Sequence, residues 1–217
     1  ASILPVNDTT VSRSWSDSYP YNIVSAFALH PQYLDLNALG PLRDKKRMTV
    51  FLRRQRELNA LSYTDYEAVQ SVKLEYIRNV FEERGNQTLD TKEFKQWFDE
   101  NRDWLVPYAE WLASKSSVNC QPSTVNIVYY LQYHLHLQLK AAADYARQHG
   151  VSLKGDVPIG VNRESVETAT HPEFFCLDCS TGAPPDNFSP NGQNWGFPTY
   201  NWEEPSTIIS WLRKRLR

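Results

Sequence analysis

The sequence lacks a long apolar run, an even set of cysteines and a strong charge of either sign. No stretch of about 18 apolar residues occurs, and the mean hydropathy is -0.55, which argues against a membrane span. The formal net charge of -2 gives no signature of a polyanion-binding protein, so we expect neither nucleic acid nor a membrane as a partner. Three cysteines, an odd number, argue against a disulfide framework and predict a reducing, cytoplasmic location.

What is present fits a folded globular protein. The 217 residues are 41% hydrophobic, enough for one good core or two small ones. The first residues, ASILPVNDTT, contain no basic segment followed by an apolar core, so we expect no secretory signal. The near-neutral charge makes a small uncharged molecule the expected partner.

The segment 181–202, TGAPPDNFSPNGQNWGFPTYNW, is the most unusual stretch of the chain. Five of the thirteen prolines lie between Pro184 and Pro205, so neither a helix interior nor a central strand fits most of it. We predict a stiffened loop. It carries five aromatic rings: Phe188, Trp195, Phe197, Tyr200 and Trp202. Such rings suit a sugar, which has both apolar and hydroxyl surface; alternatively, they only pin a long connection to the domain body.

The first forty residues place polar groups after short apolar runs. Ser2–Val6 predicts a buried strand that ends at Asn7, and strand ends carry sites in α/β folds. Further on, Tyr19 and Tyr21 flank Pro20 in an extended turn. These tyrosines either contact a substrate or close the top of a core.

From about residue 42 to residue 116 the composition becomes charged and helix-forming, which predicts a separate helical insertion. Thr64 and Glu67 fit a capping box, and the apolar spacing that follows stops at Gly85. A second helix begins at Asp90 or Thr91, and a third short segment continues past Pro107. The many rings in these helices occupy positions typical of a core, and the charged residues between them are typical of a solvated face.

The next helix is predicted over Val125–Gln148, with Gly150 as its stop. His134 and His136 lie two residues apart and therefore point to different helix faces, so we expect no metal site. Beyond the helix, Asp156 interrupts an apolar strand. Because a buried carboxylate needs partners, we interpret it as a ligand-binding group in preference to a loop anchor.

Two features near the end of the chain favour ordinary structural roles. Cys176 and Cys179 form a single C-x-x-C, which lacks the other ligands of a zinc site and does not open a helix, so we expect reduced thiols. The segment from Ser206 predicts an amphipathic helix with Ile208, Ile209, Trp211 and Leu212 inward. Its basic end, RKRLR, suits a helix dipole better than nucleic acid.

Together these pieces resemble the 4-α-glucanotransferases, also called amylomaltases or disproportionating enzymes. That family carries GDxPIGV followed by GxPPDxFSxxGQxWGxPxYxW, and the matching residues here are Gly155-Asp156, Pro158 to Val161, Gly182 to Asp186, Phe188-Ser189, Gly192-Gln193, Trp195-Gly196, Pro198, Tyr200 and Trp202. The opening ILPVNDTT and WSDSYPYNIVSAFALHP are similar to the branch that contains the cytosolic plant enzyme and related bacterial proteins.

The resemblance implies an α/β fold, a partial TIM-type (β/α) barrel with a large helical insertion. Residues 1–41 would form the first barrel strand-loop units, 42–118 the helical insertion, and 119–217 further strand-helix units with the aromatic loop 181–202. It also implies transfer of α-1,4-glucan segments between maltooligosaccharides by a retaining mechanism, without a cofactor.

The resemblance also implies substrate-binding roles for six residues. Tyr21 would help define the donor-side sugar site, and Asp156 would be the family's third-strand aspartate. The loop that covers the acceptor side would contain Asp186, Phe188, Gln193 and Trp195. Two departures affect sugar contacts: Asn187 replaces a tyrosine often found after PPD, and residues 167–170 (ETAT) replace an Asp-x-Trp run.

A retaining transfer needs two carboxyl groups about 5 to 5.5 Å apart, a nucleophile and an acid/base. In the family these follow the last motif present here, and a complete barrel takes about 250 residues. We therefore expect a fragment of the catalytic domain with no catalytic residue of its own, inactive alone. The alternatives are a non-catalytic carbohydrate-binding module and a structural half-barrel protein. A half-barrel exposes strand edges and an apolar face, which predicts self-association.

Overall fold

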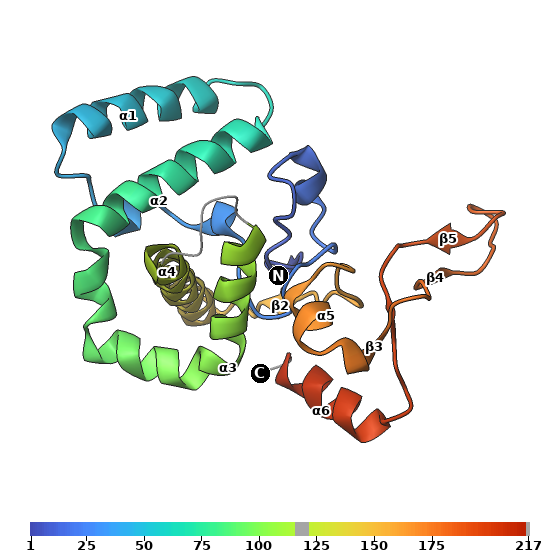
Figure 1. The fold of residues 1–217 in the computed structure, drawn as a ribbon. Coiled ribbons are helices and arrows are strands. Elements are labelled where there is room, and N and C mark those ends of the chain that lie inside the picture. The colour runs from blue at the N-terminus through green and yellow to red at the C-terminus, as the bar shows by residue number, and fades with distance from the viewer. Residues whose placement is uncertain (116–121, 216–217) are drawn as a thin grey trace.

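Four long helices lie together on one side of the molecule, and loops with short paired strands occupy the other (Figure 1). The computed structural model describes residues 1–115 and 122–215. The helices are α1 (Lys45–Asn59), α2 (Tyr66–Leu89), α3 (Lys92–Lys115), α4 (Pro122–Gln148), α5 (Val166–Thr170) and α6 (Pro205–Lys214). Short 3₁₀ helices are η1 (Trp15–Ser18), η2 (Pro31–Tyr33), η3 (Asn37–Leu39) and η4 (Pro172–Phe174). The predicted boundary between residues 118 and 119 and the end of RKRLR lie outside the described residues.

Helix α2 begins at a single aspartate. The carboxylate of Asp65 accepts a 3.0 Å hydrogen bond from the backbone N–H of Ala68, which satisfies one of the free donors at the helix start. The predicted capping box of Thr64 and Glu67 is therefore wrong. Glu67 is used elsewhere, since its carboxylate accepts a 2.7 Å hydrogen bond from the backbone N–H of Trp15.

Two predicted helix breaks are also wrong. Helix α2 continues through Gly85 to its end at Leu89. A Cβ atom on Gly85 would lie 2.1 Å from the ring of Phe81, so glycine at this position makes room for that ring. Helix α3 continues through Pro107, and no separate third segment forms.

Other predicted helix ends are confirmed. The hydroxyl of Thr91 accepts a 3.2 Å hydrogen bond from the backbone N–H of Phe94 and caps α3. Helix α4 ends at Gln148, one residue past Arg147, and Gly150 follows with φ of 70°, a conformation that glycine adopts without strain.

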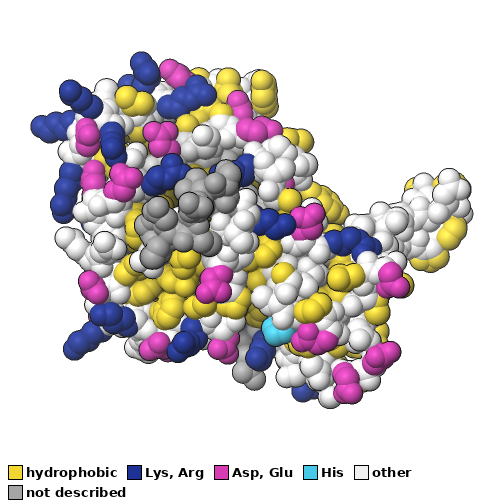
Figure 2. Space-filling model, viewed as in Figure 1, with side chains coloured by type: hydrophobic (Ala, Val, Ile, Leu, Met, Phe, Trp, Pro, Cys, Tyr) yellow, Lys and Arg dark blue, Asp and Glu magenta, His cyan; other side chains and the backbone are white. Residues whose placement is uncertain are grey.

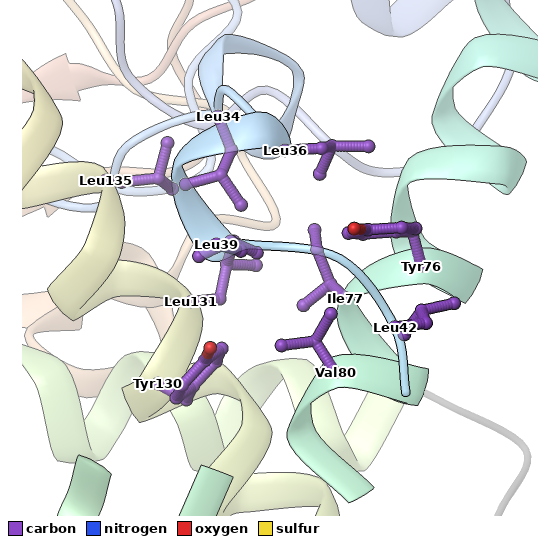
Figure 3. Packing of buried hydrophobic residues seen from close by; sticks show 10 residues of the cluster. All are labelled: Leu34, Leu36, Leu39, Leu42, Tyr76, Ile77, Val80, Tyr130, Leu131 and Leu135. Carbon is purple, nitrogen blue, oxygen red and sulfur yellow. The ribbon is translucent and has the colours of Figure 1, made fainter. Parts of the chain in front are cut away.

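The largest core joins the helices to the segment after η2. Side chains from residues 34–42 pack between α2 and α4, as Figure 3 shows in close view. The ten buried members are Leu34, Leu36, Leu39, Leu42, Tyr76, Ile77, Val80, Tyr130, Leu131 and Leu135. The helical segment therefore shares its core with α4 and with the N-terminal part of the chain.

The strands form three two-stranded sheets in the described part of the chain. β1 (Ser2–Ile3) pairs in parallel with β2 (Lys154–Gly155). The prediction of a buried strand over Ser2–Val6 is wrong, because β1 has two residues and Leu4 directly after it is 60% exposed.

The other two sheets are antiparallel. β3 (Phe175–Cys176) pairs with β6 (Thr199–Tyr200), and β4 (Gly182–Ala183) pairs with β5 (Gln193–Asn194). Residues 182–195, the β4–β5 hairpin with its turn, stand away from the body in Figure 1, and we call them the arm. The predicted loop thus contains a short hairpin.

A second core lies beneath the base of the arm. Its buried members are Ile23, Ala26, Val161, Phe174, Phe175, Ile208 and Trp211. The inward positions predicted for Ile208 and Trp211 of α6 are confirmed, whereas Ile209 is 41% exposed and that prediction is wrong. Among the described helices, none is both long and apolar enough to cross a membrane.

Candidate functional site

A tyrosine and an aspartate meet where the parallel strands end. Asp156 directly follows β2, and its backbone N–H donates a 3.2 Å hydrogen bond to the carbonyl of Ile3 at the end of β1. The hydroxyl of Tyr21 donates a 2.7 Å hydrogen bond to Asp156 Oδ2. This bond, lost if the phenol ionises, raises the pKa of Tyr21 above its ordinary value, and burial adds to the shift.

The surroundings of this pair are open and aromatic. Asp156 is exposed and Tyr21 is half-buried. The ring of Tyr19 lies 5.6 Å from the ring of Tyr21 and is 56% exposed. An accessible carboxylate beside two phenol rings can accept hydrogen bonds from hydroxyl groups and offers an apolar surface to the same ligand. Tyr19 is the neighbour that the predicted site residues did not include.

The turn that carries Tyr21 is held by a buried carboxylate. Asp17 accepts hydrogen bonds from the backbone N–H groups of Val11, Ser12 and Arg13 at 3.1, 2.9 and 2.5 Å, while its side chain is buried. Arg13 adopts φ of 58°, a left-handed conformation that non-glycine residues rarely take. These hydrogen bonds hold residues 11–13 against η1, the short helix that precedes Tyr21.

A second clamp ties the segment after Tyr21 to the segment after Asp156. The side-chain amide of Asn162 donates a 2.9 Å hydrogen bond to the side-chain carbonyl of Asn22, and its backbone N–H donates a 2.8 Å bond to the carbonyl of Ile23. Three consecutive residues, 21–23, are therefore hydrogen-bonded to the segment that contains Asp156 and Asn162.

The arm holds the other four predicted site residues, and two of them serve its turn. Asp186 Oδ1 accepts hydrogen bonds from the backbone N–H groups of Phe188 and Ser189 at 2.8 and 2.6 Å. Its carboxylate therefore shapes the turn. Phe188, two residues further on, is 95% exposed, and Figure 2 shows hydrophobic side chains at the outer end of the projecting arm.

Of the remaining pair, Gln193 is on the returning strand β5 and Trp195 directly follows it. Gln193 Oε1 accepts a 2.9 Å hydrogen bond from the indole N–H of Trp195, a residue that is 39% exposed. Phe197, just after the arm, is buried, and Tyr200 packs against the second core. Phe197 and Tyr200 therefore anchor the aromatic segment to the body, as one interpretation predicts, whereas Phe188 and Trp195 are exposed and available to a ligand.

The base of the arm contacts the loop that follows Asp156. The hydroxyl of Tyr200 donates a 2.7 Å hydrogen bond to the carbonyl of Ile159, and Arg215 donates a 2.7 Å bond to the carbonyl of Pro158. A Cβ atom on Gly160 would lie 2.8 Å from Phe197, so these segments approach closely. The structure brings Tyr21 and Asp156 together, and the arm residues form a second group joined to them through this loop. Within the described residues, no hydrogen bond connects the two groups directly.

Besides Asp17, two more buried acids lie outside the predicted set of site residues. Asp8 accepts a 2.7 Å hydrogen bond from the hydroxyl of Tyr108 and a 3.0 Å bond from the backbone N–H of Thr10. Glu167, in the ETAT run, accepts a 2.7 Å bond from the backbone N–H of Ala26, and burial raises its pKa. Both brace the N-terminal loops. The one sequence signal for either acid is that Asp8 follows the apolar run Ser2–Val6 by two residues.

Residues 1–115 and 122–215 contain no group of three or more histidine, cysteine, aspartate or glutamate side chains placed to hold a metal ion. His134 is half-buried in α4 beside the ring of Tyr130, and burial lowers its pKa to about 4. His136 packs against the ring of Trp97.

Comparisons with known proteins agree along the whole chain. The profile of a family described as 4-alpha-glucanotransferase matches residues 1–124 and 116–217. A 4-alpha-glucanotransferase of Oryza sativa subsp. japonica is 41% identical over 248 residues, covering 99% of this chain and 25% of that protein. A 4-alpha-glucanotransferase of Chlamydia pneumoniae is 29% identical, covering 99% of this chain and 44% of that protein.

Solved structures show the same fold. An amylomaltase from Streptococcus agalactiae in complex with acarbose superposes with a TM-score of 0.74 at 23% identity, over 99% of this chain and 48% of that one. An amylomaltase from Corynebacterium glutamicum gives a TM-score of 0.69 at 21% identity, over 92% of this chain and 31% of that one. The chain thus spans between a quarter and a half of the length of these proteins.

Proposed function

The chain belongs to the 4-alpha-glucanotransferase family, and we propose that it is part of an enzyme that transfers α-1,4-glucan segments between maltooligosaccharides. The transfer is retaining and uses no cofactor. The observation that carries this proposal is the Tyr21–Asp156 pair at the ends of the parallel strands β1 and β2, where α/β folds place their ligands. An amylomaltase with this fold binds acarbose, which supports a sugar as the ligand of this site.

The pair forms the donor-side sugar site. A glucose unit offers hydroxyl groups around its rim and an apolar face, and both find partners here. Asp156 accepts hydrogen bonds from two neighbouring hydroxyls when the Tyr21 phenol shares the second carboxylate oxygen. The rings of Tyr19 and Tyr21 contact the apolar face of the sugar.

The arm covers the acceptor side. Its rigid Asx turn at Asp186 holds Phe188 outward, and the Gln193–Trp195 bond fixes an exposed indole beside an amide that can still donate a hydrogen bond. Tyr200, beyond the arm, and Arg215, at the end of α6, both donate hydrogen bonds to the loop after Asp156, so this loop links the two halves of the site.

The domain is a partial TIM-type barrel with a helical insertion. The parallel β1–β2 pair supports barrel strands, and α1 to α3 supply the insertion between them. We keep the division into residues 1–41, 42–118 and 119–217 as part of this proposal. The nucleophile and the acid/base of a retaining transfer are outside this chain.

Maltotriose assays test the assignment. The chain alone should release no glucose above a blank, whereas it should bind maltoheptaose, seen as a change in tryptophan fluorescence. Glucose release by the chain would contradict the absence of the catalytic carboxyl groups. Failure to bind maltoheptaose would contradict the sugar site itself.

A non-catalytic carbohydrate-binding module is the second candidate, favoured by the exposure of Phe188 and Trp195 on the arm. It predicts micromolar binding that depends on the arm and not on Asp156. Replacing Phe188 by alanine and, separately, Asp156 by asparagine distinguishes the two, because the enzyme-fragment proposal requires the larger loss from the aspartate change.

Exposed apolar side chains also support self-association. Val157 and Ile159, beside β2, are 43% and 63% exposed, and Leu4 after β1 is 60% exposed. We infer that a second copy of the chain covers this edge of the β1–β2 sheet. Sedimentation should show a dimer, and a monomer at all concentrations would contradict it.

The free thiols of Cys176 and Cys179 fit the proposed cytoplasmic location, which imaging of the tagged protein tests.

A further inference from the structure

The two cysteines of the C-x-x-C motif lie at the ends of one turn. Cys176 is the second residue of β3 and is half-buried, and Cys179 is exposed. Between them Leu177 and Asp178 form the turn, which is closed by a 3.4 Å hydrogen bond from the backbone N–H of Cys179 to the carbonyl of Cys176. Both thiols are free in the structure.

The turn keeps the two cysteines close together. The first and fourth residues of a β-turn have Cα atoms less than about 7 Å apart. A disulfide bridges Cα atoms about 4.4 to 6.8 Å apart. The turn therefore limits the Cα separation of Cys176 and Cys179 to about 7 Å, which overlaps the range that a disulfide spans.

Contacts on both sides hold the turn in place. Cys176 is fixed in register opposite Thr199 by the pairing of β3 with β6. On the other side the guanidinium of Arg163 donates hydrogen bonds to the carbonyls of Leu177 and Cys179, and a 2.6 Å bond to the hydroxyl of Ser180. The turn is thus preorganised by its neighbours as well as by its own hydrogen bond.

We propose that Cys176 and Cys179 are a redox-active dithiol site that exchanges with small disulfides such as oxidised glutathione. The exposed thiolate of Cys179 attacks one sulfur of glutathione disulfide, forming a mixed disulfide and releasing one glutathione thiolate. The thiolate of Cys176 then attacks Sγ of Cys179 and releases the second glutathione. The two cysteines lose two electrons and two protons in total, and one glutathione disulfide becomes two glutathione molecules.

The cysteine turn lies directly before the arm in the chain. Thr181 follows Cys179 by two residues, and its backbone N–H donates a 2.8 Å bond to the carbonyl of Phe197 while its carbonyl accepts a 3.0 Å bond from Trp195 N–H. Both ends of the arm therefore meet at the residue that the turn leads into. This inference does not depend on the proposed glucan transfer.

Thiol titration and mass spectrometry test the site. In a Cys120→Ser variant, which leaves these two thiols alone, oxidised glutathione should remove both thiols and leave a monomer lighter by two hydrogen atoms. Dithiothreitol should restore them. Proteolytic mapping of the wild-type chain should find the same Cys176–Cys179 bond. Two unreacted thiols, a retained glutathione or a cross-link between chains would overturn the proposal.

Further substitutions in the Cys120→Ser background test the order of attack and the role of the turn. Cys176→Ser should trap one glutathione on Cys179, whereas Cys179→Ser should react more slowly because its remaining thiol is half-buried. Arg163→Gln loosens the turn, so half-oxidation should need a several-fold higher ratio of oxidised to reduced glutathione. An unchanged midpoint, or faster reaction of Cys176, would contradict the mechanism.

Discussion

The hydroxyl of Tyr21 lies 2.7 Å from Asp156 Oδ2, joining two residues that are 135 positions apart. Each stands on a segment that other contacts hold in place: Asp17 closes the loop before Tyr21, and Asn162 ties the two segments together. The pair is therefore a product of the tertiary fold. It provides an accessible carboxylate whose orientation is already set before a ligand arrives.

Replacing Tyr21 by phenylalanine keeps the ring and removes the hydrogen bond to Asp156. We expect maltoheptaose binding to weaken about threefold to tenfold, because the carboxylate is no longer held in one orientation. Tryptophan fluorescence titration measures the affinity. Tyr63→Phe is the control, since Tyr63 is 73% exposed, and an equal loss in both variants would contradict a specific role.

The same hydrogen bond predicts that sugar binding weakens at alkaline pH. The Tyr21 pKa lies above the ordinary tyrosine value of 10.0, mainly because the protonated phenol donates a hydrogen bond to Asp156. The stabilisation is therefore fully present below about pH 10 and is lost as pH rises through the raised pKa. Binding by the wild-type chain should fall in that range, whereas binding by Tyr21→Phe should not follow the same titration. Identical profiles for the two would be the contrary result.

Gly182→Ala tests whether the arm depends on its hairpin. A Cβ atom there would lie 2.0 Å from the carbonyl oxygen of Gln193, so β4 and β5 cannot keep their pairing. We expect faster chymotrypsin cleavage at Phe188 and weaker sugar binding, with little change in the unfolding of the cores. Gly155→Ala is the matched control, because nothing lies within 4 Å of its Cβ position. Equal cleavage rates in the two variants would argue against a paired arm.

The Tyr108 hydroxyl is expected to contribute to stability. Tyr108 and Asp8 are both buried and share a 2.7 Å hydrogen bond. Tyr108→Phe leaves one carboxylate oxygen without this donor, which should lower the free energy of unfolding by about 1 to 3 kcal/mol. Urea unfolding measures the change. Tyr145→Phe, at a position 64% exposed, should be neutral, and similar effects in both would contradict the prediction.

Glu167 predicts a pH dependence of stability. Burial raises the pKa of Glu167, and Oε2 has no hydrogen-bond partner among the described residues. The folded state therefore favours the protonated acid, and this contribution, full below about pH 4.5, is lost as pH rises through the raised pKa. Urea unfolding across this range should show a fall for the wild-type chain that Glu167→Gln lacks. A variant with the same slope would show that another group titrates.

Much of the helical part of the fold could be predicted from sequence, because helix caps and spacing are local. The start of α3 at Thr91 and the stop at Gly150 follow from side chains within one turn. The helix stop predicted at Gly85 is wrong because glycine also occurs where a neighbouring side chain packs closely, here the ring of Phe81. That contact depends on the ring's orientation, which the spacing of residues does not specify.

The candidate site was less accessible to sequence reasoning. Resemblance to a family identified Tyr21 and Asp156, but no periodic pattern could bring residues so far apart together. For the aromatic segment the sequence predicts only a loop. Its division into exposed rings on the arm and rings held at the body depends on tertiary contacts, such as those of Tyr200 with the second core and of Phe197 with Gly160.

The central claim is that Asp156 binds the sugar, and one titration tests it most directly. Maltoheptaose is added to the wild-type chain, to Asp156→Asn and to Asp99→Asn, whose side chain is exposed on α3. We predict binding by the wild type and by Asp99→Asn with equal affinity, and at least about tenfold weaker binding by Asp156→Asn. Equal affinity of Asp156→Asn and the wild type would contradict the account.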